Sequence, residues 1–269
     1  VLYVVMNLPL FFALALIVWQ LGPYKLGMLG APTTYLLYGA IGGMAAVQFL
    51  RIWQINGHVF QRPVPAFDRY PFKQVALLNL VYMASFGSEL AVVSMLPLYF
   101  LDTFDISPML AGMLGGSFAL MNLFGRPGGG YLADRYGRKL ITILMLAGIA
   151  VGYFFMARID SSWPLPLAVA LVVLCSIFVQ GGCGAVYASV PLVKRRLTGQ
   201  VAGMAGAYGN VGGVVFLVVL ALVPSDQFFL VLGAIALAIM SLVMIFMDEP
   251  DPQTSEVMPD GSVRMIDVT

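Results

Sequence analysis

The stretch NLFGRPGGGYLADRYGRKL, residues 122–140, places an arginine inside an apolar run that ends in a cluster of charges. Arg126 precedes Asp134, at the polar edge of this run, by eight residues, which is about 12 Å along a helix. Because half of a bilayer's hydrocarbon core is about 15 Å thick, Arg126 is predicted to lie near the membrane midplane. An arginine there costs roughly 2.5 to 3.5 kcal/mol to insert, so it typically faces a bundle interior or a water-filled cavity. Arg126 is therefore a candidate site residue, with snorkelling or a purely structural ion pair to Glu89 as the alternative.

The composition as a whole is that of a polytopic membrane protein. Hydrophobic residues make up 60% of the chain and charged residues 10%, whereas ordinary soluble domains are about 25% charged. A membrane-spanning helix needs about 20 mostly apolar residues. Eight runs reach this length, near residues 2–21, 33–53, 75–100, 107–130, 139–157, 163–191, 200–222 and 227–247. We therefore expect an all-α bundle that crosses the lipid bilayer about eight times.

The positions of Lys and Arg predict the orientation of these spans. Cytoplasmic loops of membrane proteins carry an excess of these residues. If the 54–73 connection is cytoplasmic, only Lys25 and Arg158 lie on the opposite side. The eleven on the cytoplasmic side are Arg51, Arg62, Arg69, Lys73, Arg135, Arg138, Lys139, Lys194, Arg195, Arg196 and Arg264. The sequence thus predicts a multi-pass protein of the cell membrane with a cytoplasmic C-terminus.

The longest polar connection, 54–73, divides the predicted spans into unequal groups. Residues 1–53 hold two spans, and residues 74–247 hold six. This asymmetry, together with a first residue that is Val rather than Met, suggests that earlier helices are missing from the chain. Residues 248–269 carry six of the thirteen carboxylates, and we interpret them as a disordered, solvated cytoplasmic tail.

Several function classes find no support in the sequence. Cys175 and Cys183 are eight residues apart in one apolar run, about 12 Å along a helix, which is too far for a disulfide. The only histidine, His58, lies in a polar loop, so no metal site or other cofactor is expected. A net charge of +1 gives no indication of a nucleic-acid partner. The spans contain no nucleophile–base pair or phosphate loop that would indicate a membrane enzyme.

Glu89 is the other ionisable residue that lies plainly within a predicted span. Tyr82, Phe86 and Glu89 occur at positions i, i+4 and i+7, which places two aromatic rings and a carboxylate on one face of a helix. Such spacing is compatible with ordinary packing or with a lined site. Glu89 is a candidate proton-coupling residue, or alternatively a residue that orients Arg126.

Two glycine-rich runs lie in later spans. In VAGMAGAYGNVGGVVF, residues 201–216, glycines surround Asn210, and glycine in membrane helices allows close backbone contact. The Asn210 amide needs a partner at membrane depth, which is either a neighbouring helix or a bound anion. The second run, VQGGCGAVYASVP, contains Gln180 and Tyr187, which we assign to packing.

The stretch GGGYLADRYGRK, residues 128–139, matches the G-x-L-A-D-R-x-G-R-K loop motif of the major facilitator superfamily. Gly130 is expected to permit tight helix contact, and Asp134 to cap the following helix and to pair with a cytoplasmic arginine. Such contacts would hold an inner gate shut. The residues of this candidate gating motif are Gly130, Asp134, Arg135, Gly137, Arg138 and Lys139.

Within this superfamily, three stretches together resemble the nitrate/nitrite porter family: YMASFGSEL, FGRPGGGYLAD and AGMAGAYGNVGG. The resemblance covers about 70–247 and implies helices seven to twelve of a twelve-helix transporter, with 1–53 as the end of the first half. It further implies that Arg126 binds the anion and that Tyr82 and Phe86 line its site. The corresponding motif helix would contribute Gly206, Gly209, Asn210 and Gly213.

The resemblance implies transport of nitrate, with nitrite as a further candidate, and with protons as a candidate coupling ion. The family's matching arginine on helix two and its first-half glycine motif are absent here, so the chain is expected to hold half a site. The missing N-terminal half of the same protein would supply the rest. A carrier of another small anion, a proton-coupled drug or sugar carrier, and a receptor that binds without transport are the alternatives.

Overall fold

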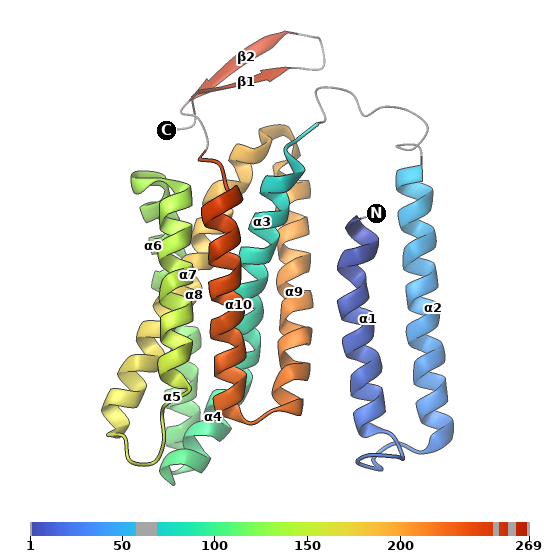
Figure 1. Ribbon diagram of the computed structural model, residues 1–269, viewed down its shortest axis with the longest axis vertical. Coiled ribbons are helices and arrows are strands. Elements are labelled where there is room, and N and C mark those ends of the chain that lie inside the picture. Colours follow the sequence, from blue (N-terminus) through green and yellow to red (C-terminus); the bar gives the residue numbers. More distant parts are fainter. Residues whose placement is uncertain (1, 58–68, 250–252, 258–261, 268–269) are drawn as a thin grey trace. The chain divides into compact units, whose positions relative to one another are not determined.

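The computed structural model describes residues 2–57, 69–249, 253–257 and 262–267. It divides into two units, Val1–Arg69 and Tyr70–Thr269 (Figure 1). In the first unit, α1 (Leu2–Leu21) packs against α2 (Ala31–Asn56). Phe11 and Phe49 meet edge to face with ring centroids 6.2 Å apart, so an aromatic contact joins the two helices.

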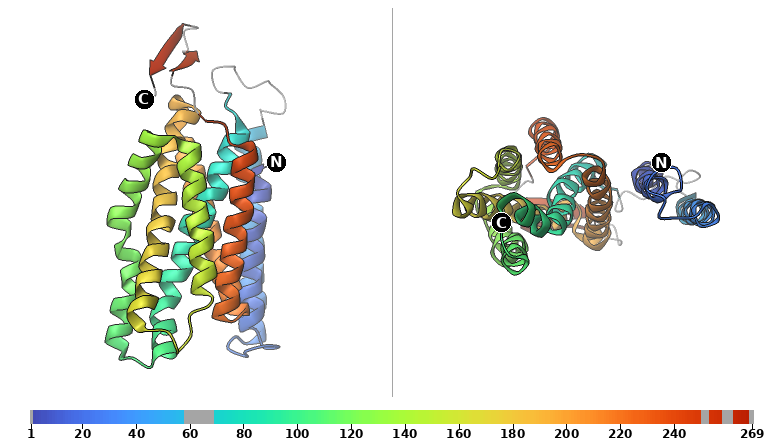
Figure 2. Two further views of the ribbon diagram at one scale, coloured as in Figure 1. Left: turned by 60° about the vertical axis from the view of Figure 1, so that its left-hand side comes forward. Right: turned by 90° about the horizontal axis from the view of Figure 1, so that it is seen from below.

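The second unit is a bundle of long helices that lie side by side (Figure 2). Its first span combines α3 (Phe72–Tyr82), the π-helical turn η3 (Met83–Gly87) and α4 (Ser88–Phe104). The next combines α5 (Pro108–Leu120) and α6 (Asn122–Tyr136). The remaining helices are α7 (Arg138–Met156), α8 (Leu165–Val193), the short 3₁₀ helix η4 (Arg195–Leu197), α9 (Thr198–Leu222) and α10 (Ser225–Phe246).

The predicted spans coincide with helices. Among the described residues, seven helices are long and apolar enough to cross a membrane, and the first predicted span coincides with α1, whose stretch Leu10–Leu21 is a shorter apolar helix. The helix ends differ from the prediction because polar residues continue a helix beyond the hydrocarbon region. The run predicted at 107–130, for example, stays helical to Tyr136, past the charged residues of the loop motif.

The interpretation of 248–269 as a disordered tail needs a correction. Two short strands, β1 (Gln253–Val257) and β2 (Val263–Asp267), form an antiparallel pair, with Gln253 opposite Asp267. β-branched residues in both segments favour the extended backbone. His58 and most of the predicted 54–73 loop lie outside the described residues.

A very close contact between α6 and α8 positions the middle of the bundle. A Cβ atom added to Gly129 would collide with the backbone of Gly181. Both helices lack side chains at this point, so their backbones approach as small residues allow in membrane helices. Arg126 lies almost one turn before Gly129 and is therefore held beside α8.

Candidate functional site

Arg126, Glu89 and Gln180 form a polar cluster in the middle of the second unit. Arg126 Nη2 donates to Glu89 Oε2 at 2.9 Å, and Arg126 Nε donates to Gln180 Oε1 at 3.1 Å. The three residues come from α6, α4 and α8. The Glu89 side chain is 8% exposed and that of Arg126 is 31% exposed. Two of the five N–H groups of arginine are thus used in these bonds to Glu89 and Gln180.

An aromatic group flanks this cluster. The rings of Tyr82 and Phe86 stack with centroids 5.1 Å apart, and Tyr187 meets Tyr82 edge to face at 5.2 Å. The Arg126 guanidinium carbon lies 5.3 Å from the Phe86 ring centroid, within the range of a cation–π contact. The structure therefore brings Tyr82, Phe86 and Glu89 together around Arg126.

A π-helical turn that contains Phe86 lies between Tyr82 and Glu89. Met83–Gly87 form η3, in which hydrogen bonds run from i to i+5 instead of i to i+4. The α-helical spacing used in the sequence prediction therefore does not describe this segment. Such turns occur frequently at functional sites, and this one lies between Tyr82 and Glu89.

The glycines of α9 let this helix lie against η3 and α4. A Cβ added to Gly209 would come within 2.7 Å of both Tyr82 and Phe86, so only glycine fits against the stacked rings. Gly213 lies against Leu90, and Gly206 lies near the Tyr187 hydroxyl. The glycine run thus supports the site chiefly through packing.

The Asn210 side chain forms a hydrogen bond within its own helix. Its Nδ2 donates to the carbonyl oxygen of Gly206 in its own helix at 2.9 Å, and its side chain is exposed. This bond uses one N–H of the Asn210 amide, and its acceptor is the carbonyl oxygen four residues earlier in α9. Any contact of Asn210 with an anion would use its remaining groups.

At the end of α6, the candidate gating motif forms a compact charged turn. Arg138 Nη2 donates to Asp134 Oδ1 at 3.0 Å, as expected for a pair with a cytoplasmic arginine. Arg135 donates to the Tyr131 hydroxyl at 2.8 Å. Gly137, with φ 101°, separates α6 from α7, so the turn uses a conformation that glycine favours.

Two expectations for this motif need correction. Asp134 does not cap α7, because the Glu249 carboxylate accepts from the backbone N–H groups of Arg138 and Lys139, at 2.7 Å each. A Cβ atom at Gly130 would make only ordinary van der Waals contact with α8, so the glycine that the close approach requires on α6 is Gly129. The carboxylate that follows α10 accepts from the first backbone N–H groups of α7, whereas the Asp134 carboxylate accepts from the Arg138 side chain.

Asp248 joins the end of α10 to the start of α3. Its carboxylate lies 2.9 Å from Lys73 Nζ and accepts from Gln74 Nε2 at 2.6 Å. The hydrogen bond from Lys73 lowers the pKa of the Asp248 carboxyl below its ordinary value. Since the folded-state pKa is lowered, this contact stabilises the fold at neutral pH and is lost as the pH falls through that lowered value.

Sequence reasoning missed Gln180, Tyr187 and Glu249. It assigned Gln180 and Tyr187 to packing, although a polar amide within a span is itself a signal that a partner is required. Glu249 had no signal, because its partners are backbone groups 110 residues away or more. Within the described ranges, no cluster of His, Cys, Asp or Glu could hold a metal ion.

The chain matches the family described as the Major Facilitator Superfamily over residues 3–217 and 78–262. The chain belongs to this superfamily. The predicted all-α major facilitator fold is thus confirmed. Because members of this superfamily are membrane transporters, the membrane-enzyme alternative is set aside.

Individual major facilitator relatives are also similar to it. The chain is 40% identical over 247 residues to the nitrate/nitrite transporter NrtP of Nostoc punctiforme, which covers 91% of this chain and 49% of that protein. With NrtP of Picosynechococcus sp. the identity is 41% over 271 residues, covering 93% and 50%. The high-affinity nitrate transporter 2.3 of Oryza sativa is 39% identical over 147 residues, 51% of this chain and 28% of that protein. The chain therefore spans about half the length of the first two relatives, and the predicted resemblance to nitrate/nitrite porters is confirmed.

Proposed function

We propose that this major facilitator chain carries one half of a transporter that moves nitrate, and also nitrite, across the cell membrane by alternating access. The observation that carries the proposal is the Arg126 guanidinium, held by Glu89 and Gln180 beside the Phe86 ring. The names of the relatives, nitrate/nitrite transporters among them, support the choice of substrate.

The chemistry of this arrangement suits a small planar anion. A guanidinium is planar and offers donors in a fixed fork, which matches two oxygens of a planar anion as it matches those of a carboxylate. Its Nε and one Nη2 hydrogen are directed to protein partners, which fixes the plane of the group. The remaining donors and the neighbouring Phe86 ring would then contact the anion. Tyr82 lies against Phe86, and Gly206, Gly209, Asn210 and Gly213 supply the facing helix.

The organisation of the chain is part of the same proposal. Residues 1–53 are the last two helices of a first half, 54–73 the cytoplasmic connection, 74–247 the second six-helix half and 248–269 a cytoplasmic segment. The excess of Lys and Arg on one side supports this orientation. The other half of the same transporter would complete the anion site.

Glu89 is proposed to couple transport to protons. Its carboxylate can take up a proton, whereas the arginine to which it is paired stays charged in proteins. A proton on Glu89 would remove the negative charge beside Arg126 and leave the guanidinium with an uncompensated positive charge. Proton and anion would then bind together.

Flux and binding measured on the full-length protein in proteoliposomes test this function. We expect saturable uptake of labelled nitrate that nitrite inhibits and that a neutral sugar leaves unchanged. Equilibrium binding without flux would instead indicate a receptor. Absence of nitrate binding, in protein shown to be folded, would rule out the proposed substrate.

A further inference from the structure

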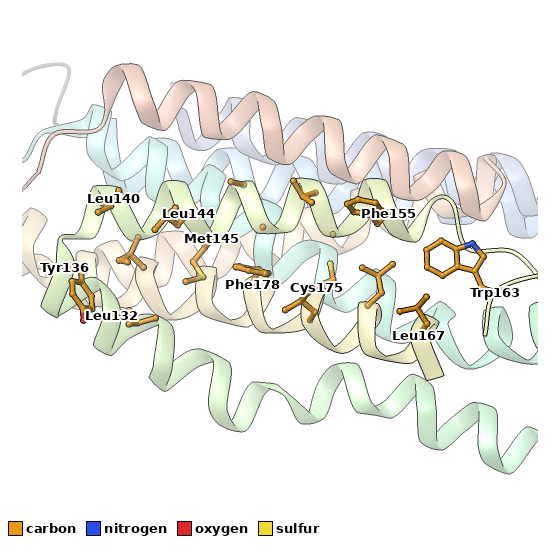
Figure 3. A pocket seen from close by; sticks show the side chains of 17 residues that line it. Leu132, Tyr136, Leu140, Leu144, Met145, Phe155, Trp163, Leu167, Cys175 and Phe178 are labelled. Carbon is orange, nitrogen blue, oxygen red and sulfur yellow. The ribbon is translucent and has the colours of Figure 1, made fainter. Parts of the chain in front are cut away.

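An apolar groove lies between α7 and α8, away from the Arg126 cluster. Its volume is about 970 Å³, and the side chains that line it come from the end of α6, from α7 and from the first part of α8. Figure 3 shows Tyr136 at one end of this groove and Trp163 at the other. Leu140, Leu144 and Val151 line it and are each about half exposed. The groove thus opens on the outer surface of the second unit.

The length of this groove matches one bilayer. Its residues follow α7 from Leu140 to Phe155, and α7 has 19 residues, about 28 Å of helix, against a hydrocarbon core of about 30 Å. The terminal Tyr136 and Trp163 are the residue types enriched at the two membrane interfaces. In the middle, Gly148 lets the Phe178 ring of α8 pack directly against α7, and this ring forms part of the groove wall.

A positive charge stands at the Tyr136 end of the groove. The Arg135 guanidinium carbon lies 5.6 Å from the centroid of the Tyr136 ring, and Tyr136 lines the groove. Within the described part of the chain, Arg135 donates to the Tyr131 hydroxyl and forms no ion pair. Asp134 and Glu249 lie beside Arg138 and Lys139 instead. Among the described residues, no carboxylate therefore pairs with the cation at this end of the groove.

We propose that this groove is a binding site for an anionic phospholipid. An acyl chain would lie along Leu140, Leu144 and Val151, and the phosphate would bind Arg135. The groove walls supply apolar contact along the chain, and Arg135 supplies the opposite charge where the headgroup must lie. The lipid site does not rest on the proposed anion transport, although Arg135 also belongs to the candidate gating motif.

A lipid fits these features better than a transmembrane helix of a partner or of a second copy. Helix association in membranes relies on small residues and interhelical hydrogen bonds, whereas the rim of this groove carries Leu140, Leu144 and Phe155. An apolar transmembrane helix would also offer no negative charge to the Arg135 guanidinium at the end of the groove. A phospholipid presents its chain and its negative charge in the required order.

Native mass spectrometry of the full-length protein tests the proposal. The protein would be titrated with phosphatidylglycerol or phosphatidylcholine of identical acyl chains. We expect phosphatidylglycerol to be retained about five-fold more strongly, the change that one basic residue contributes near a charged lipid. Arg135→Gln should bring the two lipids to equal retention. Leu144→Trp should fill the groove and weaken both, and Val151→Phe provides a second such variant.

Two variants control for charge and for bulk outside the groove. Arg195→Gln removes a cation from the turn before α9, and Leu237→Trp adds bulk to the exposed face of α10; neither should change lipid retention. Equal retention of the two lipids by the parent protein, or an unchanged preference in Arg135→Gln, would overturn the proposal. Displacement of the lipid by inorganic phosphate alone would also overturn the proposal. So would a dimer that forms when the lipid is lost, if Leu144→Trp weakens that dimer.

Discussion

Glu89 and Arg126 form an ion pair, with 2.9 Å between Oε2 and Nη2, although they belong to different spans and lie 37 residues apart. The Glu89 side chain is almost fully buried, and the Arg126 side chain is about one-third exposed. Arg126 is therefore tied to the protein on one side and accessible on the other. Substitutions of Arg126 and of Glu89 should therefore change different steps of transport.

Replacing Arg126 by lysine tests the need for the planar fork. Lysine keeps the charge but offers a single point of contact, so we expect Arg126→Lys to lose most nitrate uptake, by about ten-fold or more if one charge-assisted hydrogen bond is lost. Uptake of labelled nitrate would be measured at equal membrane abundance, with Arg195→Lys as the control. Uptake near the parental rate would contradict the role of Arg126.

Replacing Glu89 by glutamine separates proton coupling from anion binding. Glutamine cannot take up the coupled proton, so Glu89→Gln should abolish nitrate accumulation driven by a pH gradient and preserve nitrate exchange. Both would be measured in the same proteoliposomes. Intact accumulation would rule out Glu89 as the proton carrier, and a joint loss of binding and exchange would show that Glu89 serves to orient Arg126.

Gln180→Leu removes the acceptor for Arg126 Nε while keeping a side chain of similar size. The loss of a hydrogen bond to a charged group should weaken nitrate binding about ten-fold. Ser176→Ala is a matched control, because Ser176 lies about one turn earlier in α8 and its hydroxyl donates to the Phe118 carbonyl oxygen at 2.5 Å. If both variants bind nitrate like the parent, Gln180 does not position the guanidinium.

Asp134→Asn should affect the gate and leave the anion site intact. The change weakens the ion pair with Arg138 at the end of α6, far along the helix from Arg126. We expect slower turnover with equilibrium nitrate affinity within about three-fold of the parent, since an exposed ion pair contributes at most about 1 kcal/mol. A large loss of affinity with unchanged turnover would contradict this assignment.

Glu249→Ala should uncap α7. Loss of a side-chain cap costs about 1 kcal/mol, so the amides of Arg138 and Lys139 should exchange hydrogen about five-fold faster. Hydrogen exchange of the peptide that covers the start of α7 measures this. Asp160→Ala, which removes a carboxylate that caps the Ser162 amide in a different loop, should leave that peptide unchanged. Equal exchange in Glu249→Ala and the parent would show that the cap is not stabilising.

The sequence by itself determined the spans, and it predicts the depth of Arg126 in the membrane. Hydropathy over about 20 residues is a local property, because each membrane helix satisfies its own backbone hydrogen bonds. The spacing of Arg126 and Asp134 likewise follows from helical rise alone. Motif similarity indicated that Tyr82, Phe86 and the α9 glycines lie near Arg126.

Only the tertiary structure decided which groups hold Arg126 and which group caps α7. Glu89, Gln180 and Glu249 reach their partners across helices, over separations of 37, 54 and at least 110 residues. Such contacts depend on how α6 and α8 approach at Gly129 and Gly181, and on the π-helical turn that changes the direction of side chains after Tyr82. Helical periodicity carries no information about either, because it describes one helix at a time and assumes a constant 3.6 residues per turn.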